Sequence, residues 1–351
     1  MNTSRFVYNT TVALLNKKEV KPNWFGIKGQ VLKDLPEWTK QVPYQIKSIA
    51  IRDACLAVKN AIRKYKKGGG ISHVKFRSRK EPTQSCFVPK SAIKNNGIYT
   101  TILGTIQYAE ALPDNPKDSR LVWRAGCVYL KIPFTKLSVP YGENQARIVS
   151  IDPGIRNFVT FFSEALCGHI GQNDFSRIQR LATHADKLVS RMSKAGKQKK
   201  KKMSIALHRA GDKIRNLVAE LHHKAALFLV RNFDIILLPT FETSGMALKA
   251  NRKIRSKTVR NMMTFSHYKF KNFLKHKAFE YGKKVVDVCE AYTSKTHPET
   301  GEIMNIGGAK TIKLSNKEVV DRDINGARNI MLRALTDSSM SKDMQLMINF
   351  S

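Results

Sequence analysis

Three acidic residues stand at the ends of apolar segments, where their carboxylates could bind one cation together. Asp152 lies inside an apolar run, Glu242 follows the apolar run at 234–239, and Asp323 lies near the start of an amphipathic pattern at 321–331. Hard divalent cations prefer oxygen ligands such as carboxylates. If the fold brings these three residues together, the sequence predicts a site for such a cation.

Each of these acidic residues also has an explanation that needs no metal. Asp152 precedes Pro153 and Gly154, so it could simply begin a turn. An ionised aspartate in an apolar strand costs several kcal/mol unless a positive group pairs with it, and Arg156 must be weighed beside a metal ion. An aspartate at a helix start is usually a cap. The residues alone leave these explanations open.

The segments around the acidic residues predict an alternation of strands and helices, and therefore an α/β unit. Short apolar runs predict strands at 148–152, 158–162, 234–239 and 285–289. Periodic apolar residues predict helices at 266–281 and at 321–331.

Two further helices are predicted between the first two acidic residues. Apolar residues keep a spacing of three and four from Ile178 to Met192 and again from Leu207 to Leu221, which predicts two helices that pack against each other. The lysine-rich run at 197–202 is too charged to be buried, so we expect it to form the turn between them.

The amino-terminal part has a helical pattern first and a β pattern afterwards. A helix is expected after Pro43, with an apolar side from Ile46 to Tyr65 and an end at the glycines of 68–70. From His73 onward, turn-rich pieces separate short β-type runs. The strands expected there are 74–77, 86–88, 99–103, 121–123 and 127–134.

The charge of the chain indicates its partner. Lysine and arginine number 62 against 27 aspartates and glutamates, a formal net charge of +35. Such an excess repels itself unless a polyanion neutralises it, so nucleic acid is the first partner to expect. Ribosomal proteins and histones are also very basic, so charge does not separate an enzyme from a scaffold. No long apolar segment or lipidation motif is present, and no membrane partner is expected.

The cysteines indicate a reducing compartment. The five cysteines are far apart and odd in number, which predicts reduced, mostly buried thiols in an intracellular protein.

Four motifs, taken in order, resemble those of a known family. They are the run 151–158, the strand ending near Glu242, the segment 292–296 and the run 321–330. Together they resemble the RuvC-type nuclease motifs of the TnpB proteins of bacterial transposons, whose relatives in eukaryotes and giant viruses are called Fanzor. The resemblance covers roughly residues 4–335 and is densest from residue 146 onward.

The resemblance implies a fold and a domain division. The fold would be an α/β RNase H-like (RuvC) nuclease domain with an amino-terminal β-barrel, the wedge domain, and a small helical recognition lobe. The implied domains are a helical lobe at 1–70, a β-barrel at 71–140, a nuclease domain at 141–335 with a helical hairpin at about 173–230 and a degenerate zinc-finger region at about 293–320, and a tail at 336–351.

The resemblance further implies hydrolysis of phosphodiester bonds by a two-metal site. Asp152, Glu242 and Asp323 match the catalytic acidic positions and would bind two Mg²⁺ ions, for which Mn²⁺ could substitute. Asp321 could be either an alternative metal ligand or a residue that supports the ligands without touching the metal. Asn325 and Arg328 are candidates for orienting them or for touching a phosphate.

The implied partners are a structured guide RNA from the transposon and double-stranded target DNA, with one protein per RNA. Base pairing would read the target, and the protein would read only a short flanking motif. The guide RNA rests on the resemblance alone. The location would be the nucleus for a protein of eukaryotic or viral origin, and the cytoplasm or nucleoid for a bacterial one.

Basic residues in three places are expected to contact nucleic acid. Those after His73 alternate with an aromatic residue, a pattern that suits phosphate contact and base stacking, although a solvated strand face explains it too. The residues are Lys75, Arg77, Arg79, Lys80, Arg252, Lys253, Arg255, Lys257, Arg260 and Arg328.

The chain departs from the family at its zinc site. Family members commonly carry two Cys-x-x-Cys pairs between the second and third acidic motifs, whereas this chain has no cysteine after Cys289. We therefore expect no zinc and interpret His297 as an ordinary loop histidine. Two other functions stay open: a guided nucleic-acid-binding protein without cleavage, and an unguided RuvC-like nuclease that recognises DNA structure.

Overall fold

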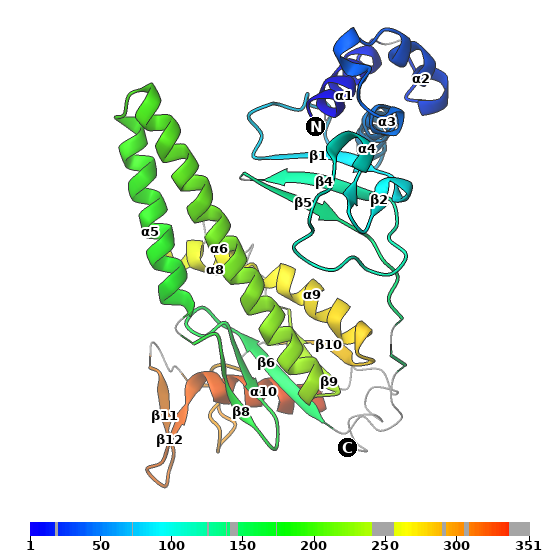
Figure 1. Cartoon of the computed structure of the whole chain (residues 1–351). Coiled ribbons are helices and arrows are strands. Elements are labelled where there is room, and N and C mark those ends of the chain that lie inside the picture. The colour runs from blue at the N-terminus through cyan, green and yellow to red at the C-terminus, as the bar shows by residue number, and fades with distance from the viewer. Residues whose placement is uncertain are drawn as a thin grey trace. The chain divides into compact units, whose positions relative to one another are not determined.

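The chain folds into two compact units, Met1–Thr135 and Lys136–Ser351, and each is described by itself. The computed structural model is shown in Figure 1. The residues it describes are 1–17, 20–71, 73–124, 126–137, 139–140, 147–172, 174–240, 256–289, 293–304 and 309–336.

Helices build the first half of the first unit. Val7 of α1 and Ile51 of α3 are fully buried and share one core with Val31 of α2. The helix expected after Pro43 is confirmed, but its last turns leave Ile62 and Tyr65 exposed. The helices are α1 (Asn2–Leu15), α2 (Trp24–Lys33), the 3-10 turn η1 (Glu37–Thr39) and α3 (Tyr44–Lys66).

Two small antiparallel sheets follow in the same unit. One has the order β1-β4-β5, and the other is the hairpin β2-β3. The described residues form no closed sheet, so the predicted β-barrel is not confirmed. The elements are β1 (Thr83–Val88), η2 (Lys90–Ala92), β2 (Ile93–Lys94), β3 (Gly97–Ile98), α4 (Thr100–Leu103), β4 (Ser119–Arg124) and β5 (Cys127–Lys131).

Two of the strands predicted in this unit are absent, for local reasons. Residues 74–77 join no sheet, because the Asn9 side chain takes the place of a neighbouring strand. Its amide donates to the Arg77 carbonyl at 2.9 Å and its oxygen accepts from the Arg77 N–H at 2.8 Å. The predicted strand 99–103 is wrong as well: Tyr99 adopts a left-handed conformation with φ 45°, and the short helix α4 follows it.

The second unit is built on a five-stranded sheet of order β10-β9-β6-β7-β8. β6, β7 and β8 form an antiparallel meander, and β9 and β10 are parallel to β6. The predicted α/β fold is thus confirmed. The strands are β6 (Ile148–Pro153), β7 (Val159–Phe162), β8 (Cys167–Ile170), β9 (Ile235–Pro239) and β10 (Lys284–Val288).

Helices cover both faces of this sheet (Figure 1). Val149 and Ile151 point into a core with α6 (Lys197–Asn232) and α9 (His267–Glu280). The alternate residue Ile148 packs beside Ile330 of α10 (Arg322–Thr336) on the opposite face. Because side chains alternate along a strand, the even-numbered residues of β6 all face α10.

The other elements of the second unit are two helices and a hairpin. They are α5 (Asp174–Ser193), which pairs with α6, α8 (Ser256–Phe265), and the hairpin of β11 (Thr311–Lys313) and β12 (Val319–Asp321). The predicted helical pair is confirmed, but the turn predicted at 197–202 is wrong. These residues begin α6, because lysine is a good helix former and all six side chains remain exposed. No helix in the described ranges has the length and apolar character needed to cross a bilayer.

The cysteines correct one prediction. All five are free, but only Cys55 and Cys86 are buried. Cys127 and Cys167 begin the edge strands β5 and β8, where one side of the strand has no neighbour, and they are exposed. The expectation of mostly buried thiols is therefore wrong.

Candidate active site

Strand β6 and helix α10 bring two of the three predicted acidic segments together. Asp152 and Ser150 both lie on the face of β6 that α10 covers. The Ser150 hydroxyl donates to the Ala327 carbonyl at 2.6 Å. A Cβ atom added at Gly326 would lie 3.1 Å from Asp152 Oδ2, so a glycine here lets α10 approach the carboxylate closely. Asp323 lies on the first turn of the same helix.

Asp321 is the cap of α10. Its Oδ1 accepts from the Asp323 N–H at 2.8 Å and from the Ile324 N–H at 3.1 Å. An aspartate in this position satisfies amides that have no partner within the helix. Of the alternatives left open by the sequence, capping thus applies to Asp321, whereas the Asp323 side chain stays partly exposed.

The third acidic residue, Glu242, lies outside the described residues. Strand β9, which precedes it, is fully buried and pairs with β6 in parallel, with Leu237 opposite Ser150. The carboxyl ends of these two strands therefore lie at the same edge of the sheet, where ligands bind in open α/β folds. Within the described ranges, no three His, Cys, Asp or Glu residues are grouped for a metal ion. The complete set of three carboxylates stays a prediction.

The buried His267 holds the turn that follows Asp152, and the buried His222 packs with it around the Phe158 ring. His267 Nε2 donates to the Gly154 carbonyl at 3.1 Å, and His222 Nε2 donates to the Phe265 carbonyl at 2.7 Å. The fully buried Phe158 ring stacks on both imidazoles, with centroid distances of 5.1 Å to His267 and 5.2 Å to His222. Burial lowers the pKa of His267 to about 4 and also lowers the pKa of His222.

Sequence reasoning missed His267, although a signal for it exists. His267, Phe270, Leu274 and Ala278 recur at intervals of three and four and form the buried face of α9. A histidine in that phase is expected to be buried. His222 lies in the corresponding buried stripe of α6, with Ala225 and Leu229.

The segment before the third motif is bound to α10 by side-chain amides. Asn325 and Asn329 donate to the Thr296 carbonyl at 2.9 and 3.0 Å, and Asn329 also donates to the Thr293 carbonyl at 3.0 Å. Arg328 Nη1 donates to the Pro298 carbonyl at 3.2 Å. These residues therefore hold the segment in place, and the predicted phosphate contact of Arg328 stays a prediction.

His297 is a structural part of that segment. It is buried, and its Nδ1 accepts from the N–H groups of Glu299 and Thr300 at 3.3 Å each. Its own N–H donates to the Glu302 carbonyl at 2.8 Å. His297 thus lies in a loop and is bonded within it, and the expectation that it binds no zinc stays a prediction.

The basic residues predicted to contact nucleic acid differ in how far they are engaged by the protein. Lys75, Arg79 and Lys80 are exposed. The Arg77 guanidinium lies 3.7 Å from the Tyr8 ring centroid and 3.9 Å from a carboxylate oxygen of Asp53.

In the second unit, Arg260 forms an ion pair with Asp186. Arg252, Lys253 and Arg255 lie outside the described residues, as does the side chain of Lys257.

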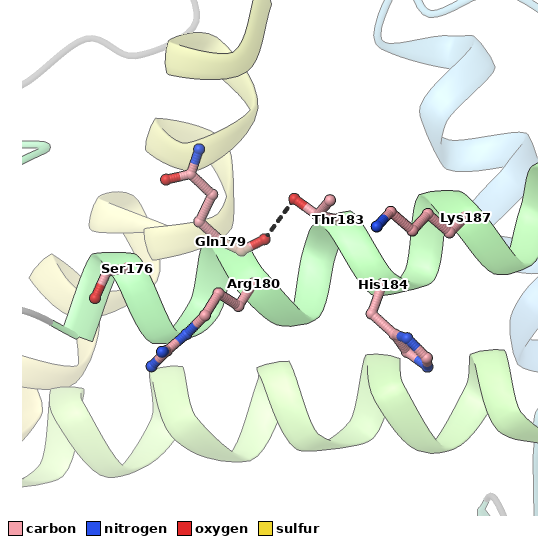
Figure 2. A pocket seen from close by; sticks show the side chains of 6 residues that line it. All are labelled: Ser176, Gln179, Arg180, Thr183, His184 and Lys187. Atoms are coloured by element: carbon pink, nitrogen blue, oxygen red, sulfur yellow. Dashed lines mark hydrogen bonds between the residues drawn. The ribbon is translucent and has the colours of Figure 1, made fainter.

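A hollow of about 470 Å³ lies along α5, and none of the three predicted acidic residues lines it (Figure 2). Arg180, His184 and Lys187 are on one stretch of this helix, and the Thr183 hydroxyl donates to the Gln179 carbonyl at 2.9 Å. All of its lining residues come from one helix, so the hollow is a surface feature rather than an enclosed site.

Comparisons with known proteins agree with the motifs. The family model of the Cas12f1-like, TNB domain matches residues 267–330. A TnpB-like protein of Acanthamoeba polyphaga mimivirus is 29% identical over 191 residues, which are 52% of this chain and 36% of that protein. The chain is related to the TnpB-like proteins. The resemblance predicted from its motifs is confirmed.

Other relatives differ in coverage. A putative transposase of Paramecium bursaria Chlorella virus 1 is 26% identical over 365 residues, covering 95% of this chain and 82% of that protein. A solved Cas12f1–sgRNA–target DNA complex matches with a TM-score of 0.49 and 13% identity, over 94% of this chain and 80% of that one. The chain spans only about a third of the length of the TnpB-like mimivirus protein.

Proposed function

We propose that this chain is a metal-dependent DNA endonuclease that a bound RNA guides to its target. The observation that carries the proposal is the close approach of α10 to the Asp152 carboxylate at Gly326, which gathers the first and third acidic segments on one face of the sheet. The relation to the TnpB-like proteins and the charge of +35 support the same function.

Asp152, Glu242 and Asp323 are the residues that would hold the metal ions, Mg²⁺ or Mn²⁺. Asp152 and Asp323, which the structure describes, suit a metal site. They come from elements that pack together, and both side chains are partly exposed. Such ions activate water for attack on a phosphodiester and stabilise the leaving oxygen.

The chain's other residues would keep the carboxylates in place. Ser150 fixes α10 on the strand through the Ala327 carbonyl, and His267 fixes the turn after Asp152 through the Gly154 carbonyl. Asp321 caps the helix turn that carries Asp323. Preorganised ligands of this kind lower the cost of binding the ions and the substrate.

The proposed partners are a transposon-derived guide RNA and double-stranded DNA beside a short flanking motif, with one protein per RNA. The exposed Lys75, Arg79 and Lys80 of the first unit are proposed backbone contacts. The finer division into a helical lobe, a wedge domain and a nuclease domain belongs to this proposal.

The test starts from the full chain purified from its native host. RNA that copurifies is sequenced, and DNA matching it is offered in the presence of Mg²⁺. We expect cleavage by the wild type and its loss in Asp152→Asn. Glu164→Gln is the matched control, because Glu164 is an exposed acid of the same unit.

Each outcome selects one function. Matching cleavage that Asp152→Asn abolishes supports the guided nuclease. Bound RNA without cleavage indicates a guided binding protein, and cleavage without RNA indicates an unguided nuclease. If about ten phosphates are neutralised, log affinity for duplex should fall against log salt with a slope of about −9. A slope near zero would remove nucleic acid as the partner.

A further inference from the structure

A row of polar side chains crosses three strands of the sheet on the face that α10 covers. Thr160 of β7 stands directly opposite Asp152 of β6 on one side and His169 of β8 on the other. Residues directly opposite each other in neighbouring strands point to the same face. Asp152, Thr160 and His169 therefore lie side by side, and the row runs from the candidate metal ligand to the sheet edge.

The hydrogen bonds of His169 fix its ring. The side chains of Thr160 and Asn157 approach His169 Nδ1 at 3.0 and 3.1 Å. Since an amide nitrogen can only donate, Nδ1 is the acceptor and the ring proton lies on Nε2. This Nε2–H faces Asp321 Oδ2 at 3.7 Å. At that separation the contact is an electrostatic attraction rather than a hydrogen bond.

Asp321 connects this row to the start of α10. Its Oδ2 faces His169, while its Oδ1 accepts from the N–H groups of Asp323 and Ile324. This one carboxylate therefore lies between β8 and the first turn of the helix, which it caps. Asp323, a candidate metal ligand, is part of that turn.

We propose that His169 is a positioning residue for the metal site: acting through Asp321, it sets the first turn of α10 and so places Asp323 relative to Asp152. The proposal rests on the proposed function, because it assigns Asp323 a role in metal binding. His169 itself would touch neither the ions nor the DNA.

The test compares two polar substitutions of one residue in the full chain. His169→Gln places an amide N–H near the position of Nε2, whereas His169→Asn reaches only as far as Nδ1. Both are neutral, so they differ mainly in whether the donor toward Asp321 is kept. His276→Gln serves as a control, because His276 is an exposed histidine of the same unit.

The first measurement needs no activity. Amide hydrogen exchange of residues 322–326 reports the stability of the helix start. We expect exchange to be about fivefold faster in His169→Asn than in the wild type, the size expected when an N-cap is weakened. It should stay near the wild-type rate in His169→Gln and in the control.

The second measurement is the Mg²⁺ concentration that gives half-maximal cleavage. In His169→Asn this Mg²⁺ concentration should rise about tenfold. That is the lower end of the loss of metal affinity seen when a residue that supports a metal ligand is substituted. At saturating Mg²⁺ the rate should approach that of the wild type, and His169→Gln should restore the Mg²⁺ dependence. A purely structural role would lower both variants' melting temperature and leave the Mg²⁺ dependence unchanged.

The outcomes separate this inference from the proposed function. If the wild type does not cleave, the proposed function fails, while faster exchange in His169→Asn alone still supports the link to α10. If the wild type cleaves and His169→Asn matches it in exchange or in Mg²⁺ dependence, the inference is wrong and the nuclease stands. Should both His169 variants unfold, Thr160→Val tests the same network, with smaller shifts in the same direction expected.

Discussion

Acid should destabilise the second unit through His267, a histidine buried against the turn that follows Asp152. The side chain is 4% exposed, and its Nε2 donates to the Gly154 carbonyl. Burial lowers its pKa from 6.5 to about 4. We propose His267→Gln as the perturbation, because the glutamine amide keeps a donor for Gly154 but does not titrate.

The sign and size of the effect follow from where the proton binds. The unfolded chain takes up the proton near pH 6.5, whereas the native state takes it up only near pH 4. Between these values the unfolded state binds more protons, so stability falls as the pH falls. The full difference corresponds to about 3 kcal/mol, of which about 2 kcal/mol is lost by about pH 5. His222, whose pKa is also lowered, contributes in the same direction.

The assay is denaturant unfolding followed by circular dichroism at neutral pH and at about pH 5. All three tryptophans, Trp24, Trp38 and Trp123, lie in the first unit, so tryptophan fluorescence follows that unit as an internal control. The loss of unfolding free energy for the second unit should be about 2 kcal/mol smaller in His267→Gln than in the wild type. His276→Gln should behave as the wild type does. Parallel pH profiles for His267→Gln and the wild type would refute the reasoning.

Three further predictions use stability and binding as measurements. Burial raises the pKa of Asp234, but hydrogen bonds from basic side chains outweigh it and lower the pKa to about 2. Asp234→Asn should therefore cost about 2 kcal/mol at neutral pH, a deficit that shrinks below pH 3.8 in urea unfolding. Arg77→Ala should lower the melting temperature of the first unit by removing its contact with the Tyr8 ring, whereas Arg79→Ala should weaken nucleic-acid binding alone in a filter-binding assay. Asn329→Leu should cost about 1–3 kcal/mol by removing its two hydrogen bonds to the Thr293 and Thr296 carbonyls, which thermal unfolding would detect.

The sheet of the second unit was predictable where its strands are buried and apolar. β9 carries only apolar residues and β6 is apolar except for Ser150 and Asp152, so both strands could be placed from composition. β8 was missed because it is a short edge strand with no fully buried residue, so it lacks both an apolar run and an alternation. In the first unit, Tyr, Thr and Ile favoured a strand at 99–103, but the left-handed Tyr99 overrides their β propensity.

The site was predictable only in part, because its contacts join segments that are distant in the chain. The motif at 321–330 predicted a helix with acidic residues at its start, and the structure assigns the cap to Asp321. The partners of His169 come from cross-strand register, which a single sequence does not display. The Phe158 stack on His222 and His267 likewise depends on packing between α6, α9 and the sheet.

Most residues of the run 321–330, which opens helix α10, contact other parts of the second unit. Gly326 and Ala327 meet Asp152 and Ser150, so one side of the helix is fixed on β6. Asn325 and Asn329, one turn apart, hold the Thr296 carbonyl on another side, and Ile330 packs into the core beneath the sheet.

Nearly every residue of the motif therefore has a structural partner, apart from any part in chemistry. It follows that loss of activity on substituting a residue of α10 is not evidence that the residue binds a metal. To conclude that a residue binds a metal, its substitution must change the Mg²⁺ dependence of cleavage while amide hydrogen exchange in α10 stays at the wild-type rate. We expect Asp323→Asn to meet this condition, since the contacts of its helix turn run through its backbone N–H to Asp321.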